Sequence, residues 1–351
     1  MINTQQCIGD AVPHYIIAIH QKIEQEGYDC FIVGGAVRDL LMGVTPIEYD
    51  LASNAPPDEI IRLFNAKTRS QFGMVRVFFE GQVVEITCFR KEGGYDDFRH
   101  PSQLEFVSDI ESDLHRRDFT INAMAYHPIK RQLIDLFQGQ LHLKNRQLVC
   151  VGNPYDRFSE DTLRPYRCFR FMAQLGFGLD ASIPLALCQS ASLPLPAIER
   201  IKSEITRLLK SPDWVLGIQA MIRYGWWPFS SEFLYPPASC ELDVDYRWAW
   251  LVSLGDVSDG MSFLGFSKSF KQRLLHIIAW DFDPFCIELS VADLQISSKE
   301  LQAFGFFNQT LGQVQKELLN QIRLYQIENN AGAIRSYLKE QYPEPFKGLE
   351  L

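Results

Sequence analysis

The spacing of apolar residues changes near residue 156, and this change limits the possible folds more than any other feature of the sequence. Before it, residues 75–80 and 83–89 predict two strands joined across Gly81, and the second strand alternates aliphatic with polar side chains. After it, apolar residues recur at helical spacing in three successive segments. These segments are residues 157–177, 197–212 and 213–225. We therefore expect an α/β N-terminal part followed by an all-helical remainder.

A glycine turn between a strand and a helix lies near the N-terminus. Residues 16–23 read as an amphipathic helix, and the compact apolar run 30–33 reads as a strand that stops at Gly34 and Gly35. Residues 36–43 then read as a second helix. Paired glycines let the backbone approach a bulky anion, and the N–H groups of the following helix point toward it. A plain tight turn is the alternative.

Three acidic residues are candidate metal ligands. Glu48 and Asp50 are two apart, so in a strand both carboxylates would project from the same face. Two neighbouring carboxylates repel each other unless a cation lies between them, and Mg²⁺ prefers such oxygen ligands. Glu85 supplies a third carboxylate from a neighbouring strand. Solvated acids on a surface strand are the alternative.

Composition limits the class of protein. With 351 residues, the chain predicts two or more packed units. Its start lacks a basic and apolar leader and no apolar run is long enough for a membrane span, so we expect a soluble, unexported, cytoplasmic protein with its eight scattered cysteines reduced. The net charge of −9 restricts any RNA-binding surface to a local patch. The candidate patch contains Arg157, Arg164, Arg167 and Arg170.

Several motifs, taken in order, resemble those of the class II CCA-adding enzymes and bacterial poly(A) polymerases. They are FIVGGAVRDLLMG, the acid pair, VEITCFRKEGGYDDFRHP, RRDFTINAMAY and EDTLRPYR. The resemblance extends over roughly residues 30–212, and RRDFTINAMAY is its most specific element. The segment 296–325 is similar, more loosely, to the helical tail of CCA-adding enzymes.

The resemblance implies an α+β fold. Its N-terminal part would be a polymerase-β-type nucleotidyltransferase head, with a mixed sheet and helices, followed by an all-α neck, body and tail. The implied boundaries are 1–150 for the catalytic head, 151–225 for a neck that selects the nucleotide, and 226–351 for a body and tail that bind tRNA.

The resemblance also implies roles in the head. Glu48 and Asp50 would hold Mg²⁺, with Glu85 as the supporting acid. The triphosphate would be held by Gly34, Gly35 and Arg38. The incoming nucleotide would be contacted by Arg116, Arg117, Asp118 and Asn122. Without the family context, the RRD sequence would be a surface cluster of ion pairs.

In the neck, Asp161 and Arg164 are three residues apart and would share a helix face. A carboxylate accepts a hydrogen bond from the amino group that cytosine and adenine share, and a guanidinium donates to the ring acceptors beside it, so the pair would select C and A. A plain ion pair on a helix surface is the alternative. Arg167 and Arg170 would contact the nucleotide or tRNA backbone, or brace helices, and the ERIKSE segment at 199–204 would hold neighbouring helices.

Smaller features bear on the product. The segment RKEGGYDDFRHP keeps the loop that CC-adding enzymes shorten, and SQFGMVRVFF lacks the basic segment of poly(A) polymerases. Full CCA addition from CTP and ATP is therefore the leading interpretation, and the acceptor stem and T arm of tRNA would be the partner. A-only addition, CC-only addition and poly(A) synthesis are alternatives. Oligomeric state is left open.

Two residues depart from the family pattern. Glu48 stands where the family has an aspartate, and Pro165 lies inside the EDTLR helix. Because Mg²⁺ tolerates little geometric error, Glu48 could slow catalysis, shift the preference to Mn²⁺, or leave a tRNA-binding protein without turnover.

Overall fold

The structure is a computed structural model that describes residues 8–67, 73–95, 101–227, 229–230, 234–241, 243–279, 291, 294–323 and 330–342. Two compact units divide the chain. The first contains Met1–Leu234 and Leu254–Gly265, and the second contains Tyr235–Ser253 and Phe266–Leu351. The boundaries at 150 and 225 stay predictions.

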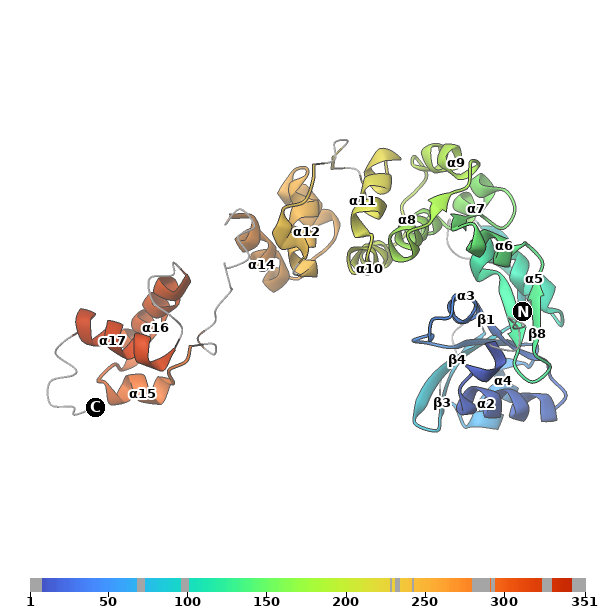
Figure 1. Ribbon diagram of the computed structural model, residues 1–351, viewed down its shortest axis with the longest axis horizontal. Helices are drawn as coiled ribbons and strands as arrows, with labels where there is room; N and C mark the ends of the chain where they lie inside the picture. The colour runs from blue at the N-terminus through green and yellow to red at the C-terminus, as the bar shows by residue number, and fades with distance from the viewer. Residues whose placement is uncertain are drawn as a thin grey trace. The chain divides into compact units, whose positions relative to one another are not determined.

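A six-stranded mixed sheet forms the first part of the chain, in the order β3-β4-β2-β1-β7-β8 (Figure 1). Strands β2 and β4 are parallel and the other neighbours are antiparallel. The strands are β1 Cys30–Val33, β2 Asp50–Ser53, β3 Met74–Phe79, β4 Gln82–Cys88, β7 Met124–His127 and β8 Gln132–Asp135. The strands predicted from sequence around 30–33, 75–80 and 83–89 are confirmed, and Gly81 makes the predicted turn at φ +79°.

Two short strand pairs accompany this sheet. They are the hairpin of β5 Arg90–Tyr95 with β6 Pro101–Phe106, and the parallel pair of β9 Gln147–Leu148 with β10 Gly178–Leu179. The hairpin contains the segment RKEGGYDDFRHP, which the resemblance predicts to be a loop. Residues 96–100 of that segment lie outside the described residues.

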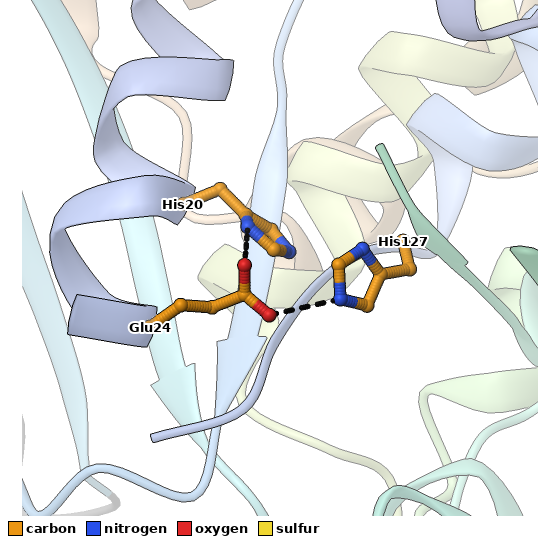
Figure 2. Close-up of side chains that lie close together, drawn as sticks. All are labelled: His20, Glu24 and His127. Atoms are coloured by element: carbon orange, nitrogen blue, oxygen red, sulfur yellow. Dashed lines mark hydrogen bonds and ion pairs between the residues drawn. The ribbon is translucent and has the colours of Figure 1, made fainter. Parts of the chain in front are cut away.

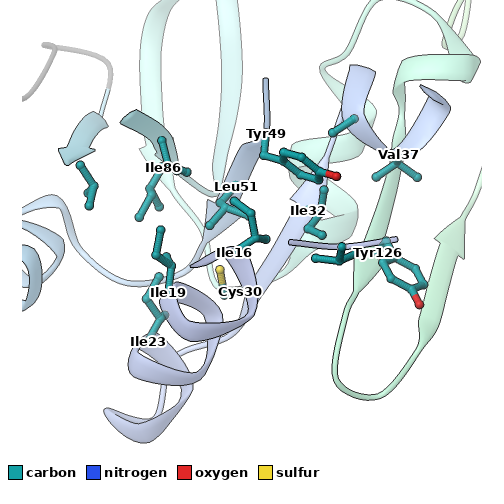
Figure 3. Packing of buried hydrophobic residues seen from close by; sticks show 14 of the residues in the cluster. Ile16, Ile19, Ile23, Cys30, Ile32, Val37, Tyr49, Leu51, Ile86 and Tyr126 are labelled. Atoms are coloured by element: carbon teal, nitrogen blue, oxygen red, sulfur yellow. The ribbon is translucent and has the colours of Figure 1, made fainter. Parts of the chain in front are cut away.

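Helices α2 (His14–Gln25) and α4 (Pro57–Phe64) cover one face of the sheet. The predicted helical spacing of Ile16, Ile19 and Ile23 is confirmed, because all three are fully buried in the cluster that contains Leu51 and Ile86 (Figure 3). On the other face, α5 (Ile110–His115) buries a second cluster against β1, β2 and β7. The side chains of Arg76 and Glu85, on β3 and β4, stay accessible.

The remaining helices of the first unit are α3 Gly35–Leu41, α6 Gly139–Lys144, α7 Pro154–Glu160, α8 Arg164–Leu175, α9 Ile183–Ser190, α10 Ile198–Leu209, α11 Trp214–Arg223 and α13 Val257–Phe263. A short 3₁₀ turn also spans Thr120–Asn122. Helix α8 packs against α10 and α11. An α+β head followed by helices is the fold class that the sequence predicts.

The single helix predicted across EDTLR is wrong. Helix α7 ends at Glu160, and α8 begins at Arg164 with Pro165 in its first turn. Proline has no backbone N–H, so it fits a first turn but would leave a gap in the hydrogen-bond ladder of a continuous helix. Asp161 takes an extended conformation at the break (φ −138°, ψ 106°) and therefore does not share a helix face with Arg164.

The second unit is helical. It contains a 3₁₀ turn at Ala238–Glu241 and the helices α12 Val244–Ser253, α14 Lys268–Ala279, α15 Ser298–Ala303, α16 Asn308–Arg323 and α17 Ala331–Gln341. Ser297 and Glu300 cap α15 reciprocally, and Gly305 separates α15 from α16 at φ +96°, which confirms the predicted glycine break. None of the helices in the described part of the chain is long and apolar enough to cross a bilayer.

Gly217 sets the close approach of α11 to α8. A Cβ added there would lie 2.7 Å from the Phe169 carbonyl oxygen and 2.9 Å from Ala173 Cβ. We expect Gly217→Ala to lower the free energy of unfolding by about 1–3 kcal/mol, despite the better helix propensity of alanine. The control is Gly312→Ala in α16, where an added Cβ meets nothing within 4 Å and should slightly stabilise the helix. Urea unfolding followed by circular dichroism measures both, and a stable Gly217→Ala protein would contradict this packing.

Candidate active site

The glycine turn between β1 and α3 lies beside an acid and a guanidinium. Gly34 has φ +70° and ψ −135°, a conformation that other residues rarely adopt. A Cβ added to Gly34 would lie 3.2 Å from Arg117 Nη1 and 4.0 Å from Asp50 Oδ2. The backbone conformation therefore requires glycine here, and Gly35 begins α3 directly after it.

The sheet brings two of the predicted acids side by side. Asp50, the first residue of β2, pairs in register with Val33 on β1 and with Glu85 on β4. Residues paired in register on neighbouring strands project from the same face of a sheet, so Asp50 and Glu85 share a face. The Glu85 carboxylate accepts a hydrogen bond from Arg76 Nη2 at 2.6 Å across the β3–β4 pair.

The predicted strand does not reach Glu48, although Glu48 and Asp50 are both exposed on either side of the buried Tyr49. Strand β2 begins only at Asp50, and Glu48 lies in an exposed bend before it, with Tyr49 buried between them. In the described residues, the oxygens of Glu48, Asp50 and Glu85 do not all lie within 4.8 Å of one another. Glu48 is still close enough for its charge to act on Asp50.

The Asp50 carboxyl is held in an environment that a cation would relieve. Although its side chain reaches solvent, partial desolvation raises its pKa above the usual range, and the Glu85 and Glu48 charges raise it further, while Arg117 opposes them. A divalent cation would offset the repulsion between these carboxylates, and hard oxygen donors suit such an ion. The residues that could hold it are Glu48, Asp50 and Glu85.

A chain of polar contacts connects the glycine turn with helix α8. Arg38 on α3 donates from Nη1 to Asn122 Oδ1 at 2.9 Å and from Nη2 to Asp39 Oδ1 at 2.7 Å. Asn122 Nδ2 lies 3.5 Å from Asp118 Oδ1, and Arg167 Nε on α8 donates to Asp118 Oδ2 at 2.6 Å. The predicted residues Arg38, Asp118, Asn122 and Arg167 thus form one network, and the first three are buried.

Helix α10 continues this network. Glu204 accepts a hydrogen bond from Arg170 Nε at 2.5 Å and lies 4.0 Å from Arg167 Nη1. Arg170 also donates to Gln174 at 2.9 Å and is buried. Of the two roles left open for Arg170, the structure therefore favours bracing α8 against α10, and the ERIKSE segment holds neighbouring helices as the resemblance implies.

The RRD sequence is built around an acid that sequence reasoning missed. Asp113 is fully buried on α5, and its two oxygens accept from Arg116 Nη2 at 2.6 Å and Arg117 Nη2 at 2.8 Å. Burial would raise the pKa of Asp113, but the two guanidinium groups lower it below its usual value. Arg116 and Arg117 thus do form ion pairs, but with a buried acid and not on the surface as the alternative supposed. The spacing of i, i+3 and i, i+4 from Asp113 is the sequence feature that indicates these pairs.

The break between α7 and α8 holds Asp161 and Arg164 by different partners. Asp161 accepts from the Leu163 N–H at 3.0 Å and from Arg200 Nη2 on α10 at 3.2 Å. Arg164 donates to Glu160 at 2.5 Å and to the Arg116 carbonyl at 3.0 Å. Arg200 was not among the predicted nucleotide contacts, and no spacing in the sequence points from it to Asp161.

The basic patch predicted for RNA is not formed by its four arginines. Arg164 and Arg170 are buried, Arg157 pairs with Glu160 at 3.1 Å, and Arg167 pairs with Asp118. These guanidinium groups form ion pairs with acids on neighbouring turns and helices. They are therefore engaged within the fold and do not form an exposed basic surface.

We expect acid to weaken the Asp118–Arg167 contact. Burial alone would raise the pKa of Asp118, but Arg167 and the Phe119 N–H lower it from 3.8 to about 2. The carboxylate therefore contributes stability above about pH 4, and this contribution is lost as the pH falls toward 2. Asp118→Asn should lose about 2 kcal/mol of unfolding free energy at pH 7 through this linkage, and the difference from the unmodified protein should shrink between pH 4 and pH 2.

Urea unfolding at a series of pH values measures this effect. The control Asp10→Asn removes an exposed ion pair with Arg131 and should cost less than about 1 kcal/mol at every pH. A difference for Asp118→Asn that stays constant with pH would show that the carboxylate charge contributes nothing.

Known proteins are similar to this chain in sequence. Residues 30–149 match the model of the Poly A polymerase head domain. The chain is 44% identical over 209 residues to the CCA-adding enzyme of Lacticaseibacillus paracasei, which covers 59% of this chain and 52% of that relative. This match spans about half the length of the relative. The chain is also 33% identical to the CCA-adding enzyme of Streptococcus gordonii, over 93% of this chain and 96% of that relative.

Solved structures share the fold. The CCA-adding enzyme of Bacillus stearothermophilus in complex with CTP superposes with a TM-score of 0.68 and 22% identity, covering 95% of this chain and 98% of that chain. The CCA-adding enzyme of Thermotoga maritima complexed with tRNA superposes with a TM-score of 0.66 and 16% identity, covering 97% and 98%. At these identities the likeness shows the fold alone.

Proposed function

The chain belongs to the family of CCA-adding enzymes, and from this premise we propose that it adds C and A, taken from CTP and ATP, to the 3′ end of tRNA. The observation that carries the proposal is the pairing of Asp50 with Glu85 on adjacent parallel strands beside the Gly34 turn. A nucleotidyltransferase needs acids beside a place where the backbone can approach a triphosphate, and this arrangement supplies both.

The residues of the head have separate roles in this proposal. The 3′-hydroxyl of the tRNA attacks the α-phosphate of CTP or ATP, and pyrophosphate leaves. The Gly34 and Gly35 backbone and Arg117 receive the phosphates, and Arg38 holds the turn through Asn122. Asp50, Glu85 and Glu48 would hold a divalent ion, which we propose is Mg²⁺, and such an ion would supply neutralising charge at the phosphates.

The neck chooses the base. Asp161 would accept a hydrogen bond from the amino group common to cytosine and adenine. Arg164, which here donates to Glu160 and the Arg116 carbonyl, would have to turn from these partners to donate to the ring acceptor beside it. Arg200 on α10 holds the Asp161 carboxylate in place. Uracil and guanine present a carbonyl at the position of that amino group, so the carboxylate faces an acceptor and is left without a partner.

In this proposal the helical remainder binds the nucleic acid. An enzyme that serves every tRNA must ignore base sequence, so we propose that the helices after residue 225 contact the acceptor stem and T arm through shape and phosphates. We place the reaction in the cytoplasm, with CTP, ATP and tRNA as its partners.

The product test uses the purified chain, tRNA lacking CCA, Mg²⁺ and radiolabelled CTP or ATP, with each nucleotide omitted in turn. We expect three additions when both nucleotides are present and only cytidines when ATP is omitted. Addition of A only, a stop after CC, or long adenosine tails on a generic RNA would each replace the proposal with the corresponding partial enzyme or poly(A) polymerase.

A second candidate is a tRNA-binding protein without turnover. The position of Glu48 favours it, because this residue lies in an exposed bend outside β2. Tight binding of tRNA with no incorporation in either Mg²⁺ or Mn²⁺ would establish this function. Incorporation in Mn²⁺ but weakly in Mg²⁺ would instead show a changed metal preference.

We expect Asp50→Asn to lower nucleotide incorporation by about 10³-fold or more, because a bound metal contributes several kcal/mol to the transition state. Binding of tRNA should stay within about 2-fold, since the helices beyond the head supply most of its contacts in this proposal. The matched control is Glu80→Gln, at the β3–β4 turn, which should leave both unchanged. Normal turnover in the Asp50 variant would refute the proposed metal site.

We expect Asp161→Ala to reduce the preference for CTP and ATP over UTP and GTP by about 10- to 100-fold, because a partner for the shared amino group is lost. Competition assays with all four nucleotides measure the ratio. Glu199→Ala, an exposed position at the start of α10, is the control. A slower enzyme with unchanged preference would assign Asp161 a structural role through Arg200.

A further inference from the structure

A cluster of two histidines and a glutamate lies between helix α2 and the end of strand β7 (Figure 2). His20 and Glu24 are one turn apart on α2, and His127 is the last residue of β7. One ligand atom from each of the three lies within 4.8 Å of the others. No residue of this cluster belongs to the acid site around Asp50.

His20 has no satisfactory partner in this cluster. Its side chain is completely buried, and neither ring nitrogen makes a hydrogen bond of good geometry, although Nδ1 lies 3.3 Å from Glu24 Oε2 and the Cys30 backbone is close enough to raise the pKa of the ring. Buried polar groups are usually hydrogen-bonded, so a buried imidazole with such weak contacts is consistent with a missing ligand. The His127 ring lies beside it, with centroids 4.5 Å apart.

Both histidines are in the form that binds metals. Burial, followed by the proximity of His127, lowers the pKa of His20 to about 4, and burial also lowers the pKa of His127. Each ring is therefore neutral near pH 7, and in His127 the protonated Nε2 donates to the Glu24 carboxylate at 2.9 Å. The Glu24 side chain is 26% exposed, so the carboxylate of the cluster reaches solvent.

We propose that His20, Glu24 and His127 bind a transition-metal dication of the zinc class. Two imidazoles and one carboxylate are a common ligand set for Zn²⁺, whereas Mg²⁺ prefers oxygen ligands alone. The bound ion fastens the N-terminal helix α2 to the β7–β8 hairpin. It occupies a site distinct from the acids of the proposed nucleotidyl transfer.

Two contacts of Lys130 oppose metal binding by this cluster. Its backbone N–H donates to His127 Nδ1 at 3.2 Å, so coordination through Nε2 moves the ring proton to Nδ1 and opens this bond. Its ammonium also lies 3.8 Å from Glu24 Oε1. The Lys130 side chain is 60% exposed, so its ammonium can move away, whereas opening the bond from its backbone N–H is a cost that the bound ion has to offset.

The test measures binding of Co²⁺ and Zn²⁺ to the full chain carrying Asp50→Asn, a background that removes the principal acid-site ligand. After removal of metals with a chelator, we expect one equivalent of Co²⁺ to bind with visible ligand-field absorption, and Zn²⁺ to displace it. The melting temperature should rise with either ion.

Matched variants in the same background decide the outcome. His20→Leu keeps a buried side chain of similar size, and we expect it to weaken binding by at least about 100-fold while raising the melting temperature in the absence of metal. Glu24→Gln, at a partly exposed position, should also abolish binding and serves if the first variant fails to fold. Equal metal binding by the background and both variants, or no binding by the background, would overturn the proposal.

Discussion

Pairing of buried charges is the constraint on which the rest of this structure depends. Arg38, Asp118, Arg164 and Arg170 are largely removed from solvent, and a buried charge is tolerated only when it is paired and hydrogen-bonded. Asp118 meets this requirement by joining Asn122 and Arg167, so the short segment after α5 is tied to α8. The glycine turn, the sheet and the first helices of the neck are therefore held by one set of contacts, which explains why the basic residues point inward.

Local features of the fold could be predicted from the sequence because they depend on neighbouring residues. The strand at 30–33, the turns at Gly34 and Gly81 and the α2 spacing follow from apolar periodicity and from backbone positions that favour glycine. Two expectations about the elements failed. The start of β2 is set by long-range pairing with β1 and β4, which leaves Glu48 outside it. The helix across EDTLR is interrupted between Glu160 and Arg164 for a local reason, because Pro165 fits only the first turn of α8.

The candidate site could be predicted as a set of residues but not as a set of contacts. Gly34, Asp50 and Glu85 do come together, because β1, β2 and β4 are neighbours in the sheet and these residues lie near the same end of them. Partners such as Asp113 for the RRD arginines, or Arg200 for Asp161, become visible only when helices have packed. His20 and His127 illustrate the same limit, since more than a hundred residues separate them and no periodicity connects a helix to a strand that lies so far along the chain.

The parallel pairing of β2 with β4 has a consequence for how such a protein can change. The spacing of Asp50 and Glu85 is fixed by main-chain hydrogen bonds between two strands, whereas Asp161 and Arg164 sit at a joint between two helices. If these residues have the roles proposed above, substitutions that tilt or lengthen those helices would alter which base is accepted without disturbing the distance between the two acids. Chemistry and choice of base would then be mechanically separable, and a lineage would acquire a new product while inheriting an unaltered reaction centre.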